Sequence, residues 1–134
     1  MSFVISDKPN DRVDQGVWVE YEGSRFLLAA AGNDNFIRRM TALRKPYRRQ
    51  EERGDGIDPA KLRQITIQAT AETVLLNWEG VKVQQNGEAV DLPYSVKAAV
   101  QALTNSIPFR NWVMEFSMDM QNFIVEAEEI EGNS

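Results

Sequence analysis

The stretch from Asp58 to Trp78 constrains the fold most, because it places apolar side chains on two opposite sides of a predicted helix. Asp58 followed by Pro59 is a typical helix start, with Asp as the N-cap and Pro at the first helical position. The stripes are Leu62, Ile65, Ala69 and Leu76 and, opposite them, Ile67, Ala71, Val74 and Trp78. Such a helix is usually buried on both sides. We expect a central helix that runs to about Asn77 and is ended by Gly80.

Two hairpins are predicted around this helix. Residues 17–21 and 25–29 are rich in strand formers and flank a turn signal at residues 22–24. A lone hairpin is only marginally stable, so we expect it to lie on helices or to gain a strand from elsewhere. A second, short hairpin is predicted around the Asn86-Gly87 turn.

Three further helices are predicted from caps and apolar spacing. The first follows residues 32–35 and presents Phe36, Met40, Leu43 and Tyr47 on one face, and Pro46 is expected to kink it or to start a new helix. The second begins after Ser95 and buries Val96, Ala99, Val100 and Leu103. The third runs from about residue 109 to residue 129, with a stripe of Phe109, Trp112, Val113, Phe116, Met120, Phe123, Ile124 and Ala127.

These elements predict one helix-dominated α+β domain over residues 1–134, with the N-terminal β-hairpin packed on three to four main helices. A chain of 134 residues is long enough to bury a core without disulfides or metals. Residues 1–14 are expected to form an irregular lead-in and residues 130–134 a frayed acidic tail.

The chain contains neither cysteine nor histidine. This excludes disulfides, Cys-zinc sites, thiol nucleophiles and Ser-His triads, although a carboxylate site for Mg²⁺ or Ca²⁺ remains open. No phosphate-binding loop is present, and no carboxylates have metal-loop spacing. We predict a protein that is not an enzyme and that has no cofactor and no metal. No apolar run reaches the ~20 residues of a membrane helix, and residues 1–7 do not resemble a signal peptide, so a cytoplasmic protein is expected.

Charge is distributed unevenly along the chain. The net charge is −5, divided between +2 for residues 1–67 and −7 for residues 68–134. Within the basic segment, Arg38, Lys45, Arg49 and Arg53 would share one face if the helix stayed regular through Pro46. This face is either simply solvated or docks an acidic partner, and the acidic total charge argues against nucleic acid. Arg38, Arg49 and Arg53 are therefore candidate partner-binding residues.

A second candidate surface is the reverse face of the last predicted helix. Met114, Met118 and Val125 form a weak stripe opposite the main one. Methionine suits adaptable apolar contacts. The stripe is either covered by another helix of the same fold or is a subunit or client interface.

Most of the chain resembles the tail assembly chaperones of long-tailed bacteriophages and prophages. In this family a helix with an Ala-x-Thr-Val-Leu pattern leads into Trp-x-Gly-Val, then an Asn/Asp-Gly turn and a Pro-aromatic-Ser/Thr helix start. The chain carries these parts in order, as residues 71–75, Trp78-Glu79-Gly80-Val81, Asn86-Gly87 and Pro93-Tyr94-Ser95. The basic segment Arg44-Lys45-Pro46-Tyr47-Arg48-Arg49 is similar to one in the family, and the resemblance covers roughly residues 17–125.

The resemblance implies a non-enzymatic protein of the bacterial host cytoplasm. It would bind and solubilise the apolar tape-measure protein, help to recruit tail-tube subunits and possess no membrane segment. Self-association also fits this role. The alternative is a virion structural protein, such as a head–tail joining or tail accessory subunit, and a nucleic-acid-binding module rests on the basic segment alone.

Some members of that family also occur in a longer, frameshifted form, which would contact the tail-tube protein. The codons for Glu131-Gly132-Asn133 admit a G-GGA-AAC slippery heptamer. The coding DNA tests this hypothesis, because the absence of such a heptamer would remove it.

Overall fold

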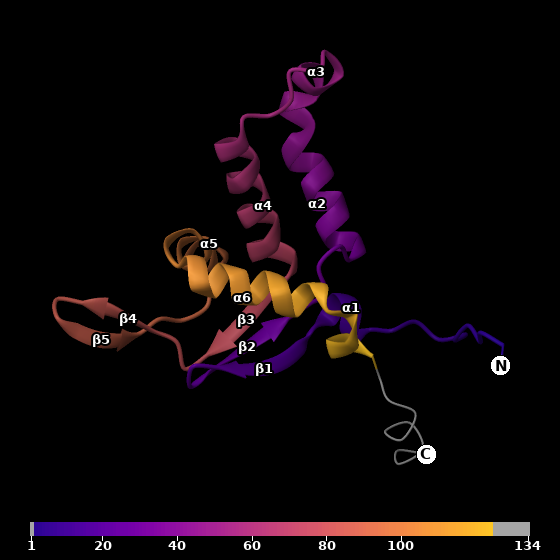
Figure 1. Ribbon diagram of the computed structural model, residues 1–134. Helices are drawn as coiled ribbons and strands as arrows, with labels where there is room; N and C mark the ends of the chain where they lie inside the picture. Colours follow the sequence, from indigo (N-terminus) through magenta and orange to yellow (C-terminus); the bar gives the residue numbers. More distant parts are fainter. Residues whose placement is uncertain (1, 125–134) are drawn as a thin grey trace.

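The computed structural model describes residues 2–124 and shows a helix-rich α+β fold (Figure 1). This confirms the predicted fold class. Three strands form an antiparallel sheet in the order β1-β2-β3, and two more strands form a separate hairpin. The elements are α1 (Arg12–Gln15), β1 (Val17–Tyr21), β2 (Ser24–Leu28), α2 (Asp34–Arg44), η1 (Lys45–Tyr47), α3 (Arg48–Glu52), α4 (Pro59–Thr73), β3 (Leu75–Glu79), β4 (Lys82–Gln85), β5 (Glu88–Asp91), α5 (Val96–Asn105), α6 (Ile107–Met118) and η2 (Met120–Phe123).

The predicted N-terminal hairpin is confirmed as β1 and β2. Tyr21 pairs with Ser24 across a two-residue turn in which Glu22 and Gly23 both have positive φ. Such a turn matches the right-handed twist of the strands it connects. The hairpin also gains the additional strand that its stability requires, because β3 pairs antiparallel with β2.

That third strand corrects the prediction for the central helix. The helix α4 begins as expected, with the Asp58 carboxylate accepting from Lys61 N, but it ends at Thr73 rather than at about Asn77. Residues 75–79 are β3, so Gly80 follows a strand and not a helix. The apolar run at this point suits a helix or a strand equally well, and pairing with β2 decides between them.

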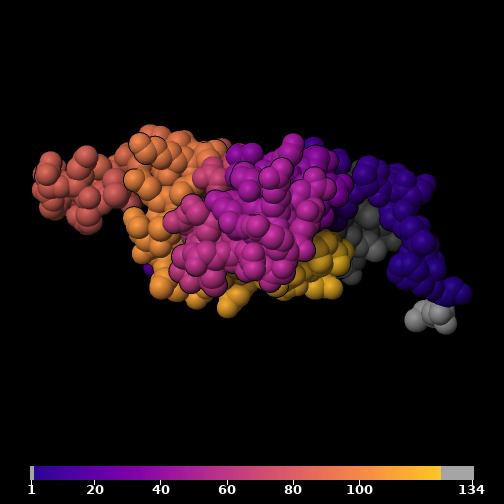
Figure 2. Space-filling model, turned by 90° about the horizontal axis from the view of Figure 1, so that it is seen from above, coloured from indigo at the N-terminus to yellow at the C-terminus, as the bar shows by residue number. Residues whose placement is uncertain are grey.

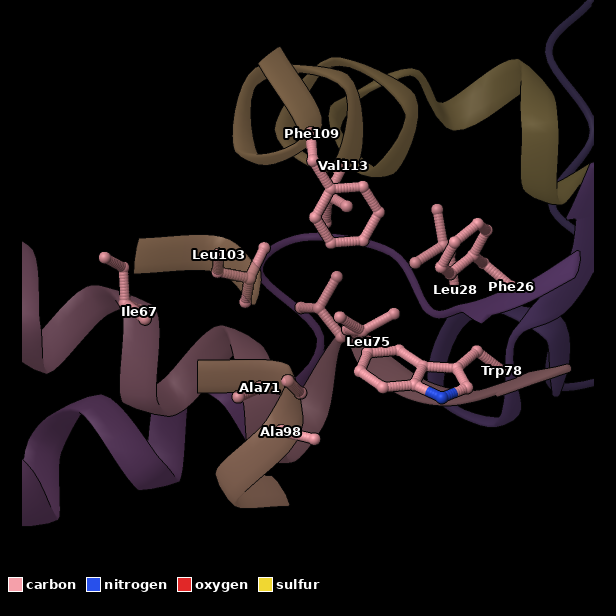
Figure 3. Packing of buried hydrophobic residues seen from close by; sticks show 12 residues of the cluster. Phe26, Leu28, Ile67, Ala71, Leu75, Trp78, Ala98, Leu103, Phe109 and Val113 are labelled. Atoms are coloured by element: carbon pink, nitrogen blue, oxygen red, sulfur yellow. The ribbon is translucent and has the colours of Figure 1, made fainter. Parts of the chain in front are cut away.

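The core lies between the sheet and helices α4, α5 and α6 (Figure 3). Phe26 of the sheet packs against Phe109 of α6, with ring centroids 5.2 Å apart. At one edge of this cluster Tyr21 stacks on Trp112 at 4.2 Å. The indole Nε1 of buried Trp78 donates a hydrogen bond to the carbonyl oxygen of Leu92 at 2.8 Å, so the ring is buried without an unpaired donor.

Helices α2 and α4 lie side by side and project away from the sheet, with α3 at their far end (Figure 1). Asn33 caps α2, as residues 32–35 predicted. Pro46 lies in the 3₁₀ turn η1, after which α3 begins, so the predicted interruption is confirmed. The central position expected for α4 is also confirmed, since it packs against α2 on one side and α5 on the other.

The last helix is shorter than predicted. It ends at Met118, and the Asp119 carboxylate then accepts from Gln121 N at 3.0 Å to cap the separate turn η2. Because the helix breaks here, Met120 and Ile124 are exposed rather than part of a buried stripe, whereas Phe123 is fully buried. Val125, Ala127, the predicted helical residues up to 129, the tail at 130–134 and the frameshift region at 131–133 lie outside the described residues.

Helix α5 is capped by Ser95, as predicted. Its buried residues are Ala98, Ala99 and Leu103, while Val96 in its first turn is exposed, contrary to expectation. The second hairpin is confirmed as β4 and β5 around Asn86-Gly87. Among residues 2–124, no helix has the length and apolar character required to span a bilayer.

Candidate functional site

A cleft of about 380 Å³ lies between α4 and α6, with a contribution from α5. We call it the α4–α6 cleft. Its lining side chains are Pro59, Leu62, Arg63, Thr66, Ile67, Thr70, Leu103, Arg110, Asn111 and Met114. Most of the lining surface is apolar, which is typical of a site that binds apolar groups.

The sequence of α4 explains one wall of this cleft. Its lining residues recur at spacings of three and four, which places them on one face of the helix. Ile67 and Leu103 are buried, while Leu62 is 36% exposed. The Thr66 hydroxyl donates to Leu62 O at 2.9 Å and the Thr70 hydroxyl to Thr66 O at 2.7 Å. Both hydroxyl hydrogens are therefore used within the helix, and the wall behaves as a largely apolar surface.

Two arginines give the cleft its charge. Arg63 comes from α4 and Arg110 from α6, and the Arg110 Nη1 atom donates to Leu103 O at 3.2 Å. Within residues 2–124, neither guanidinium forms an ion pair. An apolar cleft with two positive charges suits an apolar segment that carries acidic side chains nearby.

The structure separates the members of the predicted methionine stripe. Met114 is partly buried and lines the α4–α6 cleft. Met118 lies one turn later, is 67% exposed and does not line the cleft. Val125 lies outside the described residues. The stripe is therefore not one continuous surface in the described part of the chain.

The predicted basic face is also divided, because the helix does not stay regular through Pro46. The Arg38 guanidinium bonds to the Asn35 side chain and borders an open groove along α2 and α3, which shares no residue with the α4–α6 cleft. The Nε atom of Arg53 lies 3.7 Å from Oδ2 of Asp55, and both side chains are exposed. Arg49 is exposed and has no ion pair among residues 2–124.

Other arginines of the basic segment have structural partners. Arg39 Nε lies 2.8 Å from Glu72 Oε2, and this ion pair joins α2 to α4. Arg44 Nη2 lies 2.7 Å from Glu51 Oε2, and this pair joins α2 to α3. Partial burial by itself raises the pKa of Glu72, but hydrogen bonds from Gln68 and Arg39 and the charge of Arg39 outweigh it, so this pKa lies below its ordinary value. Much of the basic segment is thus neutralised within the fold.

Sequence reasoning missed Arg63 and Arg110. The four-residue spacing that places Arg63 beside Ile67 and Arg110 beside Met114 on a helix was available as a signal. The spacing does not reveal that α4 packs against α5 and α5 against α6. This packing brings the distant residues to one cleft.

Among residues 2–124, no cluster of three or more carboxylates, histidines or cysteines is arranged to hold a metal ion. The expectation of a protein without catalytic activity stays a prediction.

The comparison with protein families gives a match over most of the chain. A model described as "YdaY prophage protein" matches residues 31–133, more than three quarters of the chain and including every residue of the α4–α6 cleft. Comparisons with curated proteins and with solved structures give no match. The family description supports a phage or prophage origin.

Proposed function

This chain belongs to the YdaY prophage protein family, and from that premise we propose that it is a tail assembly chaperone. In this proposal it binds the tape-measure protein in the host cytoplasm, keeps it soluble and helps to recruit tail-tube subunits. The resemblance of residues 71–81 and 86–95 to such chaperones supports the proposal, as does the prophage origin of the family.

The observation that carries the proposal is the α4–α6 cleft. A tape-measure protein exposes long apolar helices, and a chaperone must cover apolar side chains that recur every three or four residues. The cleft offers Leu62, Ile67 and Met114 along two helices, and its volume of about 380 Å³ accepts a few such side chains. Helix-in-groove binding is the recognition mode that this shape favours.

Arg63 and Arg110 would orient the client helix in the cleft. They lie in the cleft wall without acidic partners among residues 2–124. Acidic residues beside the apolar stripe of the client would pair with them and fix its position. The net charge of −5 keeps the chaperone itself soluble while its cleft remains apolar.

Co-expression with the long, helical protein encoded beside this gene tests the proposal. The client is expected to become soluble and to co-elute with several copies of this chain in size-exclusion chromatography with light scattering. Met114→Asp and the more exposed Leu62→Glu place a charge in the cleft and should abolish solubilisation. Met118→Asp is the matched control, because Met118 lies on the same helix outside the cleft.

Circular dichroism separates loss of binding from loss of folding. If folded Leu62→Glu solubilises the client as well as the unaltered chain does, the cleft is not the client site. If the unaltered chain leaves the client insoluble and is found in purified phage particles, the protein is a virion subunit and not a chaperone.

A further inference from the structure

Three consecutive apolar side chains lie in solvent ahead of α1. Phe3, Val4 and Ile5 are 89%, 83% and 79% exposed. The segment of residues 2–10, which we call the arm, extends away from the body of the molecule in two views (Figures 1 and 2). Contiguous apolar residues this exposed are typical of a binding element, because water disfavours them.

The outer edge of β1 is a surface that accepts such a segment. β1 is an edge strand, paired only with β2 in the three-stranded sheet. Tyr21 and Ser24 flank the two-residue turn as a hydrogen-bonded pair, so the alternation of the ladder directs the N–H and C=O groups of Trp18 and Glu20 away from β2. Within residues 2–124, no other backbone group bonds to them.

We propose that residues 2–6 of one copy add as a strand to the β1 edge of a second copy. Residues 2–6 of the second copy add in the same way to the β1 edge of the first. The five residues Ser-Phe-Val-Ile-Ser equal β1 in length and contain three strong strand formers. Strand addition takes its affinity from main-chain hydrogen bonds and its specificity from alternate side chains. In the added strand, Phe3 and Ile5 share one face and Val4 occupies the other.

The reach and the buried area fit a second copy. The nine residues of the arm span up to roughly 30 Å when extended, enough to cross to a neighbouring sheet. Reciprocal exchange doubles the buried area, because each copy contributes both an arm and an edge, which brings the contact closer to the ~1,200–2,000 Å² of specific interfaces.

Charge permits the same occupant at the contact itself. Residues 2–6 carry no charge, so the contact itself brings no like charges together, although each whole chain carries −5. Association should therefore strengthen with added salt, which screens the repulsion between two acidic copies. The inference is separate from client binding, because no arm residue lines the α4–α6 cleft.

Size-exclusion chromatography with light scattering of the full chain tests the exchange. The expected mass is twice the 15.2 kDa of one chain. Deletion of residues 2–6 and Val4→Pro, which removes the strand N–H but keeps the residue apolar, should both give single-chain mass. Val4→Thr is the matched control, because it is β-branched and retains the backbone donor, and it should remain dimeric.

A mixing experiment identifies the edge. The Glu20 N–H points away from β2, so Glu20→Pro blocks the edge while preserving the ladder within the sheet. This variant should be monomeric alone, with an unchanged circular dichroism spectrum. Mixed with Val4→Pro at concentrations well above those that dimerise the unaltered chain, it should form a one-to-one complex, weaker than the dimer because only one intact arm meets one intact β1 edge.

Two results would overturn the exchange: a full chain that stays monomeric at every concentration, or a dimer that persists in Val4→Pro or after deletion of residues 2–6. Failure of the two variants to associate would overturn the assignment to β1. Client solubilisation by the monomeric Val4→Pro variant is a separate measurement, which tests the chaperone proposal and not the arm. If it persists, the chaperone proposal stands whatever becomes of the arm.

Discussion

The side-chain amide of Asn33 donates a hydrogen bond to the carbonyl oxygen of Thr73 at 3.1 Å, and so fastens the start of α2 to the end of α4. The same nitrogen donates to Ala30 O at 2.7 Å, and the amide oxygen accepts from Phe36 N at 3.0 Å. Asn33 is buried, so these bonds form largely away from water. One residue thereby caps α2 and connects three segments of the fold.

This arrangement requires both a donor and an acceptor at position 33. Asn33→Asp keeps the acceptor for Phe36 N but removes the donors to Ala30 O and Thr73 O. We expect the free energy of unfolding to fall by about 2–3 kcal/mol, because two buried carbonyls lose a partner and a charge is buried. Urea denaturation at neutral pH measures this loss. Asn35→Asp, two residues away and exposed, is the control, and equal losses at both positions would contradict the interpretation.

The Arg39–Glu72 ion pair predicts a pH-dependent stability. The pKa of Glu72 is lowered in the folded chain, so its contribution is complete above the pKa of the unfolded chain and is lost as pH falls through the folded value. Glu72→Gln should be less stable than the unaltered chain by ~1 kcal/mol near pH 7, and the difference should be smaller near pH 3. Urea midpoints at both pH values test this.

A surface pair on the sheet supplies the control for that experiment. Arg25 and Glu79 lie 2.9 Å apart, but each side chain is more than half exposed. Glu79→Gln should change the free energy of unfolding by less than about 0.5 kcal/mol near pH 7. A Glu72→Gln difference that persists unchanged at low pH would show that packing, not charge, stabilises this contact.

Trp78 and Trp18 of the sheet should contribute differently to the free energy of unfolding. Trp78 is buried beside Phe26 and donates to Leu92 O, whereas Trp18 is partly exposed beneath the Arg25 guanidinium. Trp78→Phe should lower the free energy of unfolding by about 2–3 kcal/mol, from lost volume and an unpaired carbonyl, and Trp18→Phe by less than ~1 kcal/mol. Thermal unfolding followed by circular dichroism compares them. Equal losses would mean that the Trp78 cavity is refilled by its neighbours.

Local chemistry explains which features the sequence predicted correctly. Asn33, Asp58 and Ser95 each start a helix because a short polar side chain accepts from a backbone N–H three residues ahead. Asn86-Gly87 marks a hairpin because both residues adopt positive φ at little cost. These signals act within a few residues, so no tertiary contact is needed to interpret them.

The end of α4 and the cleft depend on distant contacts. Nothing between Thr73 and Leu75 stops a helix locally, and the change to a strand is made by β2, where Leu28 pairs with Leu75. The end of α6 at Met118 has a local cause instead: no glycine or proline is present, but the Asp119 carboxylate caps the following turn and competes with helix continuation. Periodicity alone does not determine either outcome.

The arginines of the α4–α6 cleft give the last prediction. Arg63→Glu reverses a cleft charge and should weaken binding to a soluble, acidic tape-measure helix by about tenfold at low salt, with a smaller effect as salt rises. The predicted polar docking set of Arg38, Arg49 and Arg53 lies outside this cleft, so Arg49→Glu is the matched charge reversal and should change affinity by less than about twofold. Fluorescence anisotropy with the labelled helix measures both variants. A larger loss for Arg49→Glu than for Arg63→Glu would move the client site from the α4–α6 cleft to the basic segment around α3, because only there does that side chain contact a bound helix.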